Sequence, residues 1–151
     1  ARRAAHQDDF VDVLLGKARV HQGLLERSDA ALDAVAAWRR RKVRLATPDL
    51  VIAESVATVR KLVCGKVLAR DRALVVLDDL FALGIEVIPV GIGLCRAALQ
   101  WAERLGQTKA YDSLYLALAE QLEAELWTAD AHLANRARQV GAPWVHVVGE
   151  A

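Results

Sequence analysis

The feature that most constrains the fold is a helix-like segment followed closely by a strand-like one, late in the chain. Apolar side chains recur with the spacing i, i+3, i+4, i+7, i+8 and i+11 at Tyr111, Leu114, Tyr115, Leu118, Ala119 and Leu122. This spacing predicts an amphipathic helix with one buried stripe, for which Thr108 is the expected N-cap. The run from Leu126 to Ala129 is short enough to be a strand.

The rest of the chain alternates in the same way. Residues 10–42 are mostly helical in pattern. Thr47 and Pro48 predict the start of another helix, because a threonine hydroxyl can cap a helix N-terminus and the N–H that proline lacks has no hydrogen-bond partner at the first helical position. Further helices are expected at 69–83 and 94–105, and strands at 43–46, 85–90 and 144–148. Strands that alternate with helices predict an α/β fold, with a parallel sheet and helices on both faces.

Length and composition predict one domain over residues 1–151, because 54% hydrophobic content supplies a proper core. No apolar run approaches the roughly 18 residues that span a membrane, and the N-terminus lacks the apolar segment of a signal peptide. We therefore expect a cytoplasmic protein with no membrane partner. Cys64 and Cys95 are isolated in the sequence and are interpreted as two buried thiols.

Charge excludes a globally basic nucleic-acid binder. The chain has 20 basic and 19 acidic residues, a net charge of +1, so any attraction to a polyanion must be local. The densest basic run is Arg39–Lys42. At the end of a helix such a run more often forms a solvated face than a phosphate contact.

Two acids occupy positions suited to a ligand site. Asp112 would lie in the first turn of the helix after Thr108, and Asp130 directly follows the strand-like run. Each has a structural explanation by itself, because acids are favoured in first turns and at caps. However, the carboxyl ends of parallel strands share one sheet edge with the neighbouring helix N-termini, and ligands bind there. Asp112 and Asp130 together therefore predict a binding site for a divalent metal ion at this edge.

Glu54 is a third candidate. It lies about two turns into an otherwise apolar helical segment, so it needs a partner or a metal, because burying it unpaired would be expensive. The alternative is an exposed helix residue paired with Arg60 or Lys61.

Three stretches carry a family resemblance. They read LATPDLVIAE at 45–54, YDSLYLALAE at 111–120 and WTADAHLA at 127–134. Together they resemble the PIN-domain ribonucleases of the VapC toxin type over residues 43–148. The resemblance implies a three-layer fold with a central five-stranded parallel sheet flanked by helices on both faces.

The resemblance also implies a function. Glu54, Asp112 and Asp130 match the second, third and fourth acids of the family motif, which hold Mg²⁺ or Mn²⁺ for cleavage of RNA phosphodiester bonds. Thr128 matches the small hydroxyl residue ahead of the fourth acid, and is counted with the catalytic set. The implied protein is an endoribonuclease toxin of a type II toxin–antitoxin pair, dimeric, with RNA and a cognate antitoxin as partners.

The first acid of the motif is less clearly matched. The family has three or four apolar residues running into an Asp, whereas Asp12 follows only Phe10 and Val11. Asp12 is the favoured fourth metal ligand if residues 10–15 form a strand. If they instead match the family's first helix, the first acid would fall near His6, with Asp8 and Asp9 close by, or would be absent. The alternative function is a PIN-like binding or interaction module that has lost cleavage.

Overall fold

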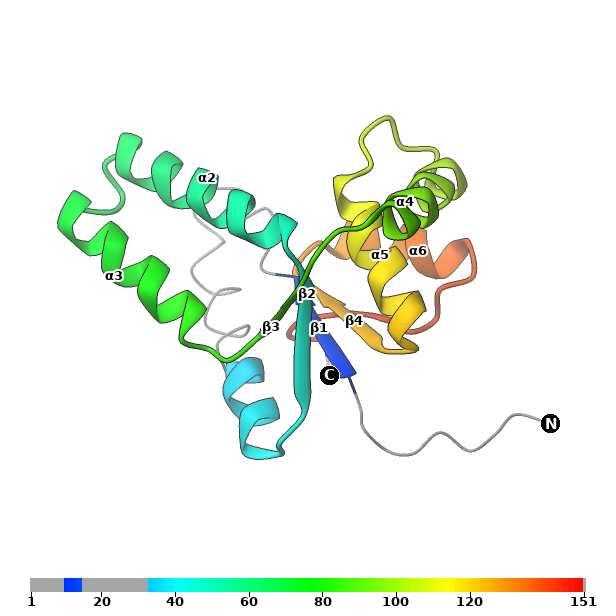
Figure 1. Ribbon diagram of the computed structural model, residues 1–151, viewed down its shortest axis with the longest axis horizontal. Coiled ribbons are helices and arrows are strands. Elements are labelled where there is room, and N and C mark those ends of the chain that lie inside the picture. The colour runs from blue at the N-terminus through cyan, green and yellow to red at the C-terminus, as the bar shows by residue number, and fades with distance from the viewer. Residues whose placement is uncertain (1–9, 15–32, 151) are drawn as a thin grey trace.

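The computed structural model describes residues 10–14 and 33–150, and for residues 10–14 it describes the backbone alone. It is an α/β fold, as the sequence predicts (Figure 1). The strands are β1 (Phe10–Leu14), β2 (Arg44–Pro48), β3 (Glu86–Ile88), β4 (Glu125–Thr128) and β5 (Val145–Val147). The helices are residues 33–40, α2 (Leu50–Cys64), α3 (Arg70–Phe81), α4 (Ile92–Leu105), α5 (Tyr111–Leu122) and α6 (Ala131–Gln139).

The strands form a five-stranded sheet in the order β3-β2-β1-β4-β5, and each neighbouring pair is parallel. β1 lies in the middle, where Asp12 pairs with Ala46 of β2 and with Leu126 of β4. The mostly helical pattern predicted for residues 10–42 is therefore wrong for residues 10–14. A short apolar run does not distinguish strand from helix by itself, so pairing with two neighbouring strands decides its conformation.

Helix α5 is enclosed on more than one side. The consecutive residues Tyr115 to Ala119 are each at most 1% exposed, because α5 packs against β1, β2 and β4 and also against α4. The single buried stripe predicted from the sequence is therefore too narrow, and its first member, Tyr111, is 55% exposed. This packing holds the N-terminal turn of α5 in place relative to the sheet.

The start of α2 differs from the prediction. Thr47 and Pro48 end β2 rather than open the helix, and the N-cap is Asp49. Pro48 pairs with Ile88 of β3, and the backbone N–H of Asp49 donates to the Ile88 carbonyl at 2.9 Å. A proline is tolerated at the end of a strand, and here the parallel ladder continues to the last residue before the helix.

The start of α5 also lies later than predicted. The helix begins at Tyr111 with Ala110 as its N-cap, and no side chain caps it, so the predicted cap Thr108 is wrong. Among the described residues, the other predicted elements are present within a few residues of their expected bounds, including α3, α4, β4 and β5. The helical pattern predicted for residues 10–42 is confirmed at residues 33–40, and its part at residues 15–32 lies outside the described residues.

The main core lies between the sheet and the helices α4, α5 and α6. In Figure 1 these three helices lie to the right of the strands, whereas α2 and α3 lie together on the left. A smaller buried cluster of Val35, Trp38 and Leu45 joins the helix 33–40 to β2.

Two further predictions concern the surface. Cys64 and Cys95 are both exposed, so the prediction of two buried thiols is wrong. Each lies on an outer position of its helix, where a small side chain meets solvent at little cost. Of the helices that the structure describes, none has the length and apolar character needed to cross a membrane.

Candidate active site

Glu54 and Tyr115 join α2 to α5 near the carboxyl edge of the sheet. Helix α2 follows the carboxyl end of β2, and α5 leads into the amino end of β4, so both helices begin at this edge. Glu54 and Tyr115 are each the fifth residue of their helices. The Tyr115 hydroxyl donates a hydrogen bond of 2.6 Å to Glu54 Oε2. The partner that the partly buried Glu54 needs is therefore a residue of another helix.

Asp112 acts on the same hydroxyl. It is the second residue of α5, near the positive end of the helix dipole, and it is partly buried. Burial raises the pKa of Tyr115 above its ordinary value, as do the hydrogen bond and charge of Glu54 and the charge of Asp112. The hydroxyl therefore keeps its proton and remains a donor. Of the predicted site acids, Glu54 thus contacts the buried phenol directly, and the charge of Asp112 acts on the same group.

Thr128 and Asp130 form the turn that joins β4 to α6. Asp130 Oδ1 accepts hydrogen bonds from the backbone N–H groups of His132 (2.9 Å) and Leu133 (3.0 Å), which makes Asp130 the N-cap of α6. The buried Thr128 Oγ1 accepts from the backbone N–H of Asp130 at 3.0 Å. The prediction of an acid just past a strand end is confirmed, and its position is fixed by three hydrogen bonds.

The role of Asp130 as the N-cap of α6 leads to a prediction about stability. We expect Asp130→Ala to lower the free energy of unfolding by about 1 kcal/mol, because it removes the acceptor of two helix N-terminal donors. Asp130→Asn should cost much less, since Asn caps a helix about as well as Asp. Urea denaturation of both variants measures the difference. Equal losses would show that the charge of Asp130, rather than its cap, stabilises α6.

Asp12 is placed by its backbone. It is the third residue of β1, and the strand continues to Leu14, which pairs with Thr128. Of the two conformations considered for residues 10–15, the strand is confirmed for residues 10–14 and the helix is wrong there. Asp12 lies in the middle of the strand rather than at its end. The alternative first acids, Asp8 and Asp9, lie outside the described residues.

The donor chemistry suits a hard divalent cation, because Mg²⁺ and Mn²⁺ prefer carboxylate oxygen and water. Among the residues whose side chains are described, no three of His, Cys, Asp and Glu lie close enough together to hold a metal ion. Glu54 and Asp112 are associated through Tyr115, and Asp130 is held at the end of β4.

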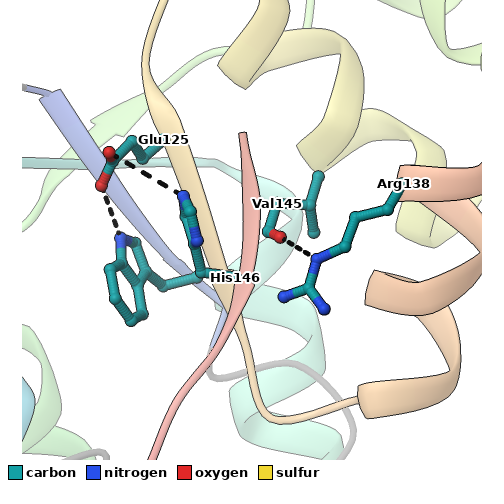
Figure 2. Close-up of polar contacts among 5 residues, drawn as sticks. Glu125, Arg138, Val145 and His146 are labelled. Carbon is teal, nitrogen blue, oxygen red and sulfur yellow. Dashed lines mark hydrogen bonds and ion pairs between the residues drawn. The ribbon is translucent and has the colours of Figure 1, made fainter. Parts of the chain in front are cut away.

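Other polar side chains near β4 and β5 make structural contacts (Figure 2). Glu125 Oε2 accepts from the indole N–H of Trp127 at 3.2 Å, and Glu125 Oε1 lies 3.8 Å from His146 Nε2. Arg138 Nε donates to the Val145 carbonyl at 2.7 Å. Glu125 begins β4, at the strand end opposite to Asp130, so this cluster is separate from the site acids.

Tyr115 is a site residue that the sequence analysis does not single out, because its place in the apolar stripe accounts for it as a core residue. A signal for it is present in the sequence. A buried tyrosine hydroxyl usually finds a hydrogen-bond partner, and a glutamate in an apolar helix needs a donor. Matching the hydroxyl donor of Tyr115 to the carboxylate acceptor of Glu54 predicts the contact between these two residues.

A parallel α/β sheet with carboxylates at its carboxyl edge is an arrangement that suits a cation and a phosphate-containing substrate. A family model described as PIN domain matches residues 22–139, and the chain belongs to the PIN domain family. PIN domains have a nuclease-like α/β fold and are generally Mg²⁺- or Mn²⁺-dependent nucleases. The matched range includes Glu54, Asp112 and Asp130 and begins after Asp12. No curated protein matches the sequence.

Proposed function

We propose that this chain is a metal-dependent endoribonuclease that cleaves RNA phosphodiester bonds. The observation that carries the proposal is the hydrogen bond from the buried Tyr115 hydroxyl to Glu54, which joins two helices far apart in the sequence, at a group on which the charge of Asp112 also acts. For stability alone, two carboxylates near one buried group are unfavourable, because like charges repel. Their association is favourable once a cation binds.

We propose Glu54, Asp112, Asp130 and Asp12 as the residues that hold Mg²⁺ or Mn²⁺. When bound, such an ion neutralises charge on the scissile phosphate and lowers the pKa of a bound water. Three of these acids are oriented by the fold. Tyr115 holds Glu54, the N-terminal turn of α5 carries Asp112, and the α6 cap fixes Asp130. Asp12 would complete the set from the middle strand of the sheet.

Thr128 has a supporting role in this proposal. Its hydroxyl is buried and bonded to the backbone N–H of Asp130, so it fixes the turn that presents the Asp130 carboxylate.

A direct test is cleavage of a broad panel of single-stranded and structured RNAs with Mg²⁺, with Mn²⁺ and with EDTA. We expect internal cleavage that requires either metal and stops with EDTA. No cleavage of any RNA with either metal would instead favour a PIN-fold interaction module that has lost its activity.

We further propose that the chain is the toxin of a type II toxin–antitoxin pair of the VapC type, acting in the cytoplasm. Residues 1–151 would form one PIN-like three-layer domain, with the parallel sheet at its centre and helices on both faces. The pairing of β1 between β2 and β4 supports this arrangement. An RNA substrate, a cognate antitoxin and a second copy of the chain are the proposed partners.

Exposed apolar side chains on α2 and α3 support a protein partner. Ile52 and Val56 of α2 are 44% and 51% exposed, and Leu74 of α3 is 69% exposed. Where such side chains form a contiguous apolar patch, the patch typically marks a protein interaction site.

We expect Leu74→Lys to weaken dimerisation at least about tenfold, because it places a charge in an apolar contact. Sedimentation equilibrium measures the dissociation constant. Leu99→Lys is the matched control, since Leu99 is 59% exposed on α4. Equal effects of both substitutions would remove α3 from the interface, and a monomeric wild type would contradict the dimer.

A further inference from the structure

We propose that Tyr115 is a positioning residue of this site, which fixes the orientation in which the Glu54 carboxylate meets a divalent cation. The inference rests on the proposed metal-dependent function and assigns a role to a residue outside the acidic set. Tyr115 acts through Glu54 and has no contact with the reacting atoms in this scheme.

The two side chains differ in mobility. Glutamate has several rotatable bonds, and Glu54 is only partly buried, so its carboxylate could adopt many orientations if it had no partner. Tyr115 is 1% exposed and belongs to the enclosed part of α5. Its hydrogen bond to Glu54 Oε2 is 2.6 Å long, in the short range of bonds to a charged acceptor. A rigid donor therefore holds a flexible ligand.

Packing alone does not account for the hydroxyl. A phenylalanine ring would fill nearly the same volume in the core, whereas the buried phenol needs an acceptor to offset its desolvation. Here the acceptor is a carboxylate, and a second carboxylate, Asp112, acts on the same group. Hydrogen-bonding partners behind metal ligands commonly orient them in this way.

The main test measures the affinity of the Tyr115→Phe variant for Mn²⁺, by calorimetry and by electron paramagnetic resonance, in the absence of RNA. We expect the dissociation constant to rise about tenfold, the lower end of the usual effect of removing such a partner. Tyr111→Phe is the matched control, because Tyr111 is the only other tyrosine in the chain, lies one turn earlier on α5 and is 55% exposed. Its Mn²⁺ affinity should equal that of the wild type.

A double-mutant cycle separates positioning from a direct role. If Tyr115 acts through Glu54, then Tyr115→Phe should change Mn²⁺ affinity little in a Glu54→Gln background. Independent, additive losses would mean that Tyr115 influences the cation by another route, and would overturn the inference.

A spectroscopic measurement avoids any variant of Tyr115. With tyrosine labelled at ¹³Cζ, only two resonances are present, and Tyr111→Phe assigns them. We expect Mg²⁺ to shift the Tyr115 resonance along the binding curve and to leave that of Tyr111 in place. Metal binding by the wild type with an unmoved Tyr115 resonance and an unchanged Tyr115→Phe affinity would overturn this inference alone. A wild type that binds neither metal would overturn it together with the proposed function.

Discussion

Replacing Asp112 with Asn is expected to abolish metal-dependent RNA cleavage while the fold stays intact. Asp112 is a proposed ligand, and its loss should cost more than the roughly 10- to 100-fold that removal of a partner behind a ligand costs. The free energy of unfolding should change by less than about 1 kcal/mol, because the loss of an acid at the helix N-terminus is offset by relief of repulsion with Glu54. Single-turnover cleavage and thermal denaturation without metal measure the two effects.

Asp71→Asn is the matched control for this variant. Asp71 is the second residue of α3, as Asp112 is of α5, and it is exposed and is not among the groups whose charge acts on Tyr115. It should retain wild-type cleavage. A large fall in the melting temperature of Asp112→Asn would instead identify Asp112 as a structural residue.

The largest effect on stability is expected from Leu116→Ala. Leu116 is fully buried in the main core, on the helix that carries both Asp112 and Tyr115. Truncation leaves a cavity as well as losing apolar burial, and should lower the free energy of unfolding by about 2–5 kcal/mol. For a chain of this size the melting temperature should fall by roughly 5 to 15 °C. Leu99→Ala on the exposed side of α4 is the control, with an expected change within about 0.5 kcal/mol.

Much of the C-terminal half could be predicted from the sequence. The β4 strand, the turn at Asp130 and the helix after it have strong local signals, because a short apolar run is followed by an acidic N-cap. Apolar spacing and the expected Thr108 cap place Asp112 in the first turn of a helix; the cap is wrong, but α5 does begin at the residue before Asp112.

The parts that could not be predicted depend on contacts distant in the sequence. The conformation of β1 is decided by β2 and β4, which follow it by more than 30 and 110 residues. The extension of β2 through Pro48 depends on β3. The hydrogen bond between Glu54 and Tyr115 spans 61 residues. Spacing within one segment describes one face of that segment, so it does not identify the partner across the fold.

The most direct measurement is an Mn²⁺ titration of the wild type, Asp12→Asn and Asp112→Asn, with RNA cleavage followed in parallel. We expect saturable Mn²⁺ binding and Mn²⁺-dependent cleavage in the wild type, weaker binding in Asp12→Asn, and no cleavage in Asp112→Asn. Affinity and activity of Asp12→Asn equal to those of the wild type would remove Asp12 from the site. A wild type that binds no Mn²⁺ and cleaves none of a broad RNA panel would contradict the assignment of a metal-dependent ribonuclease.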